Sequence, residues 1–289
     1  MLEEISVVIP TNLQVEVYSA VNSVLAQTYQ AIEIIIIDDS KDQSCDLSFF
    51  SNVRLLKTGG GMGPGYARNL GVAAAKGKWI AFLDDDDAWS TDKLEIQVTE
   101  ALSGGLDAVL TGARIIQKSM SIRPKEFLER NVSPLSAIYS KPNLFRNKYY
   151  FPMSSLIVKR EIAVKFPFSE TVYERENLLF LENIYLSGSQ MVQIKKPLTV
   201  INYSSSKSLS RMNLREEKAW LNYLLEYKSS LVNNFLLESV RNFIRIRKFK
   251  DAREILKVRN SGNNIMFRMI SIALGFLVVF DNKKLLKNH

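Results

Sequence analysis

Short apolar runs alternate with amphipathic segments through the first hundred residues. Each run has the length of one strand, and its nearly unbroken apolar character indicates a strand buried on both faces. The four runs are residues 5–9, 32–37, 53–56 and 79–83. Between them, residues 13–27 and the segment after the glycine-rich stretch 59–65 place apolar side chains at helical spacing. Strands that alternate with helices predict an α/β fold, Rossmann-like, with a mostly parallel sheet flanked by helices.

The pattern is less regular after the first hundred residues. Further strands are predicted at residues 107–116, 155–158 and 197–201, and one helix is predicted at residues 173–186. From about residue 204 onward the pattern is helical and basic. We therefore predict two domains, an α/β domain at residues 1–206 and a helical segment at residues 207–289.

Positive charge is concentrated in the second of these segments. Residues 207–289 hold 17 Lys and Arg against 7 Asp and Glu, whereas residues 1–206 hold 21 against 23. A basic surface is typical of segments that bind nucleic acid or anionic lipid, and it also occurs where it serves solubility alone.

The chain contains one cysteine, Cys45, and one histidine, His289 at its end. A disulfide framework within the chain, catalysis by a histidine base and a Cys/His zinc site are therefore excluded. The single thiol fits a reducing compartment. No signal peptide is expected, because Glu3 and Glu4 precede only a short apolar run.

Four consecutive carboxylates, Asp84 to Asp87, directly follow the apolar run at residues 79–83. In open α/β sheets, ligands bind just outside the carboxyl ends of the strands. Like charges at this position repel one another, and their hard oxygens suit Mg²⁺ or Mn²⁺ bound together with the phosphates of a substrate. The alternative is a solvated acidic turn that caps a helix starting near Ser90.

Polar residues also follow the neighbouring predicted strands. Thr11 follows the first strand and residues 38–40 follow the second, so with the acidic run they would converge on a nucleoside diphosphate. The stretch 59–65 precedes a helix whose N-terminus would stabilise an anion, and Arg68 lies in the first turns of that helix. The P-loop and G-x-G-x-x-G motifs are both absent from the sequence, which argues against ATPases and dehydrogenases.

Five motifs together resemble glycosyltransferase family 2 in their order and spacing. They are ISVVIPT at residues 5–11, SVLAQTY at 23–29, EIIIIDDS at 33–40, GPGYARNLG at 63–71 and GKWIAFLDDDDAW at 77–89. The resemblance is strong over residues 5–100 and weak over residues 150–210. It implies a GT-A fold that binds a nucleotide-sugar, preferably a UDP-sugar, through Mn²⁺ or Mg²⁺.

The resemblance also implies roles for single residues. Asp84 and Asp86 would be the outer carboxylates of a D-x-D element at the metal, with Asp86 as the foremost ligand. Asp85, between them, would face the ribose or the sugar. The residues expected to contact the nucleoside are Pro10, Thr11, Asp39 and Arg68.

The catalytic base is where the sequence departs from the family. Inverting members use the aspartate of a Glu-Asp pair that aligns with Glu176 and Asn177, and an asparagine cannot accept a proton at neutral pH. Glu174 and Glu176 are near enough to replace it, and a slightly raised pKa would suit either carboxylate for this role. The alternative is that both are surface glutamates on a helix. The family's tyrosine after the first strand and its late histidine are missing as well.

The basic C-terminal segment is interpreted as a membrane-association element. Residues 265–280 are strongly apolar, but these 16 residues include Arg268 and are short for a spanning helix of about 20 residues. They would lie in the membrane interface, with nearby lysines on anionic headgroups. The alternative is a helix packed on the first domain or on a second subunit. No RNA-binding module is recognisable, so nucleic acid is not an expected partner.

Together these features predict a metal-dependent glycosyltransferase that moves a sugar from a nucleotide-sugar to a hydroxyl of a growing, lipid-linked glycan, with inversion. The expected setting is bacterial surface-polysaccharide assembly, such as that of O-antigen, peripherally on the cytoplasmic face of the inner membrane. The alternatives are a donor-binding but inactive paralogue or scaffold, which Asn177 keeps open, and a sugar nucleotidyltransferase. The sugar, the linkage and the oligomeric state are left open by the sequence.

Overall fold

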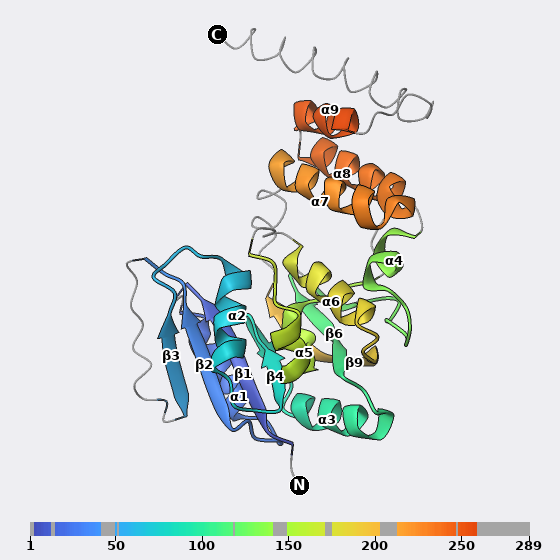
Figure 1. Cartoon of the computed structure of the whole chain (residues 1–289). Helices are drawn as coiled ribbons and strands as arrows, with labels where there is room; N and C mark the ends of the chain where they lie inside the picture. The colour runs from blue at the N-terminus through green and yellow to red at the C-terminus, as the bar shows by residue number, and fades with distance from the viewer. Residues whose placement is uncertain are drawn as a thin grey trace. The chain divides into compact units, whose positions relative to one another are not determined.

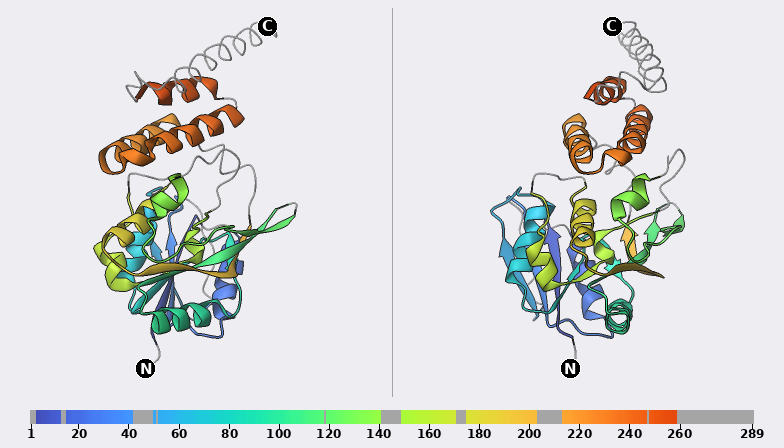
Figure 2. Two further views of the ribbon diagram at one scale, coloured as in Figure 1. Left: turned by 90° about the vertical axis from the view of Figure 1, so that its right-hand side faces the viewer. Right: turned by 45° about the vertical axis from the view of Figure 1, so that its right-hand side comes forward.

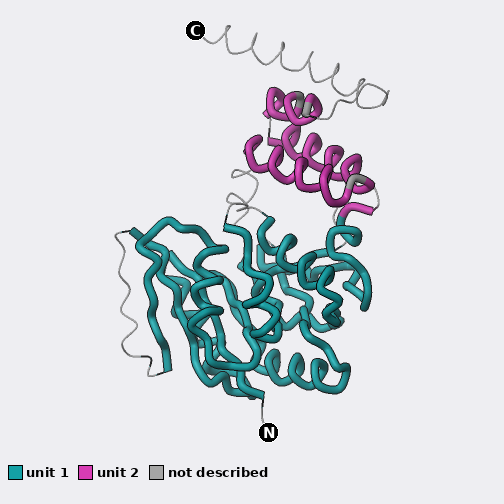
Figure 3. The backbone as a smooth tube through the Cα atoms, in the orientation of Figure 1, with its two compact units in different colours: residues 1–138, 147–203 teal, residues 139–146, 204–289 magenta. Residues whose placement is uncertain are grey.

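The computed structural model of the chain divides it into two compact units (Figure 3). Unit 1 comprises residues 1–138 and 147–203, and unit 2 comprises residues 139–146 and 204–289. The residues that the structure describes are 3–12, 15–41, 50, 52–117, 119–140, 149–170, 175–202, 213–246 and 248–258. The division into domains at residues 1–206 and 207–289 stays a prediction.

Unit 1 is built on one mixed sheet with the strand order β3-β2-β1-β4-β8-β6-β9-β5, to which β7 adds by pairing with β6 (Figure 1). The strands are β1 (Ile5–Thr11), β2 (Glu33–Asp38), β3 (Val53–Lys57), β4 (Trp79–Phe82), β5 (Asp87–Trp89), β6 (Ala108–Ile116), β7 (Met120–Arg123), β8 (Ile157–Lys159) and β9 (Met191–Asn202). The four apolar runs of the N-terminal part form the parallel half, β3-β2-β1-β4. Antiparallel pairs join β8 to β4 and β6, β5 to β9, and β7 to β6.

Helices cover both faces of this sheet (Figure 2). On one face, α1 and α3 pack against alternate apolar residues of the central strands in one buried cluster. On the other, α2 lies so close to β1 that a Cβ added at Gly71 would meet Val8 Cγ1 at 2.3 Å. The helices of unit 1 are α1 (Val17–Leu25), α2 (Pro64–Ala74), α3 (Lys93–Gly104), α4 (Pro134–Tyr139), α5 (Arg160–Lys165) and α6 (Glu176–Leu186), with a 3₁₀ turn η1 (Met153–Ser155).

Two of the predicted strands extend by two residues or more beyond their predicted bounds. The first was expected to stop before Pro10, yet β1 continues to Thr11, because β4 pairs with it only as far as Val8 and β2 alone accompanies the proline. A residue without an N–H is tolerated where a strand has a partner on one side only. The late strand is also longer than the predicted residues 197–201: β9 starts at Met191, and its pairing with β6 shifts register just before Pro197 and again after it.

Unit 2 is helical in its described residues. Its elements are α7 (Leu214–Tyr227), the 3₁₀ turn η2 (Ser229–Leu231), α8 (Val232–Arg245) and α9 (Phe249–Val258). Trp220, Phe235 and Phe243 are buried between these amphipathic helices. Within the described parts of the chain, none of the helices combines the length and apolar character that a membrane span requires. The apolar residues 265–280 lie outside the described residues.

Candidate active site

The carboxyl ends of β1, β2 and β4 lie side by side and bring together residues from three separate motifs. Thr11 pairs with Asp38 in the register of β1 and β2. The Thr11 hydroxyl donates to Asp85 Oδ2 at 2.6 Å, and the Asp39 N–H donates to the Thr11 carbonyl at 2.8 Å. The predicted convergence of these loops at one edge of the sheet is therefore present in the structure. Pro10 precedes Thr11 inside β1 and is buried.

Asp39 shapes the glycine-rich stretch before α2. Its carboxylate accepts the N–H groups of Met62 and Gly63, each at 2.8 Å, and the Thr58 hydroxyl. Residues 59–61 and 63 have φ between +76° and +96°, which glycine adopts without strain. The Asp39 side chain thus fixes the loop that leads into α2, and its contact with a nucleoside remains a prediction.

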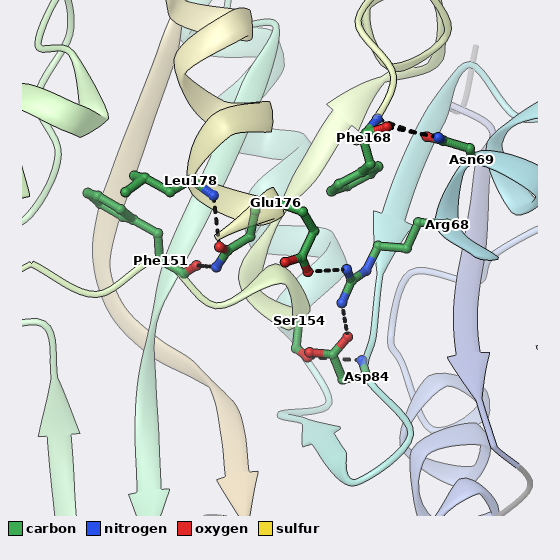
Figure 4. Close-up of polar contacts among 9 residues, drawn as sticks. Arg68, Asn69, Asp84, Phe151, Ser154, Phe168, Glu176 and Leu178 are labelled. Carbon is green, nitrogen blue, oxygen red and sulfur yellow. Dashed lines mark hydrogen bonds and ion pairs between the residues drawn. The ribbon is translucent and has the colours of Figure 1, made fainter. Parts of the chain in front are cut away.

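Arg68 lies buried between two carboxylates from distant parts of the chain (Figure 4). One of its terminal nitrogens binds Asp84 Oδ1 at 2.7 Å, and the other binds Glu176 Oε1 at 2.9 Å. The guanidinium also lies 5.4 Å from the centre of the Phe168 ring, while the buried Arg68 Nε has no hydrogen-bond partner among the residues that the structure describes. In this state Arg68 cross-links the acidic turn to the start of α6, and its predicted role toward the nucleoside is untested.

Glu176 is buried at this junction and is not the surface glutamate of the alternative prediction. Burial raises the pKa of its carboxyl above the ordinary value, although the Arg68 charge and hydrogen bond act in the opposite direction. A raised pKa suits a general base near neutral pH. Glu174 lies outside the described residues. The side chain of Asn177 points away from Arg68: its Nδ2 donates to the Phe151 carbonyl at 3.1 Å.

The acidic turn presents its carboxylates unequally. Asp86 is exposed, Asp84 and Asp85 are half-buried, and Asp87 is buried in β5. Burial raises the pKa of Asp85, and the Asp86 and Asp84 charges raise it further, against the hydrogen bond from Thr11. Negative charge is therefore in excess at the end of β4, even with Arg68 beside Asp84.

This donor set fits a hard divalent cation shared with a ligand. In the part of the chain that the structure describes, no three Asp, Glu, Cys or His side chains are grouped as a metal site. Such a group is not required, because Mg²⁺ is commonly held by one or two carboxylates plus substrate phosphates. The exposed Asp86 and the half-buried Asp84 would supply the oxygen ligands that this chemistry needs.

Sequence reasoning missed two residues that hold the acidic turn. The Ser154 hydroxyl accepts the Asp84 N–H at 3.0 Å, and Asn202 Nδ2 donates to the Asp86 carbonyl at 3.0 Å. A lone serine or asparagine far from a motif carries no signal of this role. Only the pairing of β8 and β9 into the sheet brings them near.

Comparisons with known proteins bear on the family and the fold of the chain. The family model described as "Glycosyl transferase family 2" matches residues 6–164. Succinoglycan biosynthesis protein ExoO of Rhizobium meliloti is 25% identical over 250 residues, which are 82% of this chain and 71% of that protein. The Escherichia coli protein WfaP, a UDP-Glc:alpha-D-GlcNAc-diphosphoundecaprenol beta-1,3-glucosyltransferase, is 40% identical over 102 residues, which are 34% of this chain and only 41% of WfaP.

Solved structures resemble the chain over most of its length. The crystal structure of S. aureus TarS 1–349 in complex with UDP-GlcNAc superposes with a TM-score of 0.62 at 15% identity, covering 88% of this chain and 81% of that one. At this identity the likeness bears on the fold alone.

Proposed function

This chain belongs to glycosyltransferase family 2, and from that premise we propose that it transfers a sugar from a UDP-sugar to a hydroxyl of a lipid-linked glycan, with inversion. The predicted family, enzyme class and GT-A fold are confirmed by the family match and the structural neighbours. The donor nucleotide, the metal, the acceptor and the stereochemistry are parts of the proposal.

The observation that carries the proposal is the junction of Arg68 with Asp84 and Glu176. Asp84 can bind a cation that is shared with a diphosphate, and the buried Glu176 can act as a base. The two carboxylates are 92 residues apart in the sequence, and the guanidinium of Arg68 links them. Transfer from a nucleotide-sugar needs both chemistries within the reach of one substrate pair. A protein that only binds a nucleotide-sugar would not need the base.

In the proposed reaction, Thr11, Asp39 and Asp85 line the nucleoside side of the site, and Asp84 and Asp86 hold a Mn²⁺ or Mg²⁺ ion. When bound, the ion supplies positive charge that stabilises the departing diphosphate. Glu176 takes the proton of the acceptor hydroxyl. The acceptor oxygen then bonds to the anomeric carbon as the bond to the β-phosphate breaks, and UDP leaves. Glu174 remains the alternative base.

The proposed acceptor and location rest on a relative and on the charges of unit 2. WfaP is named for an acceptor attached to diphosphoundecaprenol, and this chain matches less than half of that protein. In unit 2, α8 and α9 add the cations Arg241, Arg245, Lys250 and Lys257. These side chains support docking on an anionic membrane surface, at the cytoplasmic face where nucleotide-sugars occur. Flotation of the full chain with vesicles containing or lacking anionic lipid tests this part separately.

The transfer reaction is tested with the purified full chain, a panel of UDP-sugars and GlcNAc-diphosphoundecaprenol. We expect UDP release that depends on the acceptor, together with a product larger by one sugar. Asp86→Ala should abolish both, whereas the nearby Asp92→Ala, outside the site, should retain them. UDP-sugar binding without any transfer would instead support the inactive-paralogue alternative.

A further inference from the structure

The 3₁₀ turn η1 places one serine against both ends of the acidic turn. Ser154 is fully buried, and its hydroxyl accepts the Asp84 N–H at 3.0 Å while donating to Asp87 Oδ2 at 2.5 Å. Its carbonyl accepts the Trp89 Nε1–H at 2.7 Å and the Thr199 hydroxyl at 3.2 Å. One residue, about 70 positions away in the sequence, therefore contacts the first and last aspartates of the turn and the strand that follows. Figure 4 shows Ser154 beside Asp84, with Arg68 above Asp84.

These contacts anchor the acidic turn at both of its ends. Within the turn, the Asp87 N–H closes on the Asp84 carbonyl at 3.1 Å. The hydroxyl of Ser154 adds a fixed point at each end of this closed turn, and Arg68 holds the Asp84 carboxylate from the other side. Four neighbouring carboxylates repel one another, so without such anchors the turn would relax toward solvent. When carboxylates bind a cation together with the phosphates of a nucleotide, a small displacement of the carboxylates strongly lowers the affinity for the nucleotide.

We propose that Ser154 is a positioning residue for the donor diphosphate: it holds Asp84 and Asp86 in the orientation that binds a divalent cation with the nucleotide. This inference rests on the proposed function, because it takes Asp84 and Asp86 as the residues that face the diphosphate. It assigns to Ser154 no contact with substrate. Its effect passes through the backbone of Asp84 and the side chain of Asp87.

The chain supplies a matched control in the next residue. Ser155 is as fully buried as Ser154, and its hydroxyl donates to the Pro152 carbonyl at 2.7 Å. No contact of the Ser155 hydroxyl with the acidic turn is present among the described residues. Ser155→Ala thus removes the same group from the same 3₁₀ turn without touching residues 84–87.

The experiment compares Ser154→Ala with Ser155→Ala in two measurements on the full-length protein. The first is amide hydrogen exchange without ligand: residues 84–89 should exchange at least about tenfold faster in Ser154→Ala, and at the wild-type rate in Ser155→Ala. The second is calorimetric titration of UDP. With Mn²⁺, affinity should fall at least about tenfold in Ser154→Ala alone, because the variant loses both hydrogen bonds from the hydroxyl to the charged turn. With EDTA, all three proteins should bind UDP equally.

Each outcome bears on one claim. Equal exchange and equal Mn²⁺-dependent affinity in the two variants would overturn the positioning role while leaving the proposed function intact. Loss of UDP affinity to the same extent in EDTA would also overturn it, since the effect would then not involve the cation. A wild-type protein that binds no UDP would instead refute the proposed function, and the positioning role of Ser154 with it. If Ser154→Ala does not fold, Ser154→Cys, which keeps the volume and a weak donor, should shift both measurements in the same direction.

Discussion

Replacing Arg68 by methionine should destabilise unit 1 far more than the loss of an exposed ion pair. The change keeps a long apolar stem but leaves the carboxylates of Asp84 and Glu176 facing each other without a cation. Removing one partner of a buried ion pair costs about 3–5 kcal/mol. The Glu176 side chain is 10% exposed, but that of Asp84 is 33% exposed and can be rehydrated. We therefore expect a loss near the lower end of that range, about 3 kcal/mol.

Urea unfolding can follow unit 1 by itself. Trp79 and Trp89 belong to unit 1 and Trp220 to unit 2, so in a Trp220→Phe background the tryptophan fluorescence reports on the sheet. The control is Lys78→Met in the same background. Lys78 pairs with Glu3 at 2.8 Å but is 60% exposed, and its loss should cost less than about 1 kcal/mol.

The dependence of this loss on pH gives a second check. Burial raises the pKa of Glu176, and removing the Arg68 charge raises it further. A carboxyl with a raised pKa in the folded state favours folding below its unfolded pKa, and this contribution is lost as pH rises through the folded value. The deficit of Arg68→Met should therefore be larger at pH 7 than at pH 5. A deficit within 1 kcal/mol of that of Lys78→Met at pH 7, or one that grows on acidification, would refute the reasoning.

Two further predictions concern the base and the packing of α2. Glu176→Gln should lower kcat by about 10²–10⁴-fold and leave donor affinity unchanged. In the wild type, kcat/KM should fall as pH decreases through a pKa above the ordinary glutamate value. A near-wild-type rate in Glu176→Gln would mean that another group is the base, and Glu174 would be the first to test. Gly71→Ala should cost about 1–3 kcal/mol in the same urea assay, because its Cβ would meet Val8 Cγ1 at 2.3 Å. Adding Val8→Ala should recover part of that loss, and no recovery would mean that the clash is not the cause.

The sequence predicted the parallel half of the sheet well, because β1, β2 and β4 are nearly unbroken apolar runs buried on both faces. It was less informative where burial alternates. The first half of β9, MVQIKK, mixes apolar and polar residues without a strict alternation and was not predicted as a strand. Short strands such as β5 and β7 are stabilised by their partners more than by their own pattern.

The candidate site was predicted only as far as its motifs reach. Thr11, Asp39 and the acidic turn follow strand ends, so their convergence follows from the topology alone. The link from Arg68 to Glu176 spans 108 residues and depends on how α6 packs against α2 and β4, which no local pattern encodes. For the same reason, no local pattern singles out Ser154.

The most direct test of the central claim is calorimetric titration of UDP into the full chain, with and without Mn²⁺ and with GDP as control. We predict that UDP binds in a Mn²⁺-dependent manner and that GDP binds more weakly. Asp86→Ala should lose the part of the UDP affinity that depends on Mn²⁺. Equal binding of UDP by the wild type and Asp86→Ala in saturating Mn²⁺, or binding of neither nucleotide, would contradict the account of the acidic turn as the donor diphosphate site.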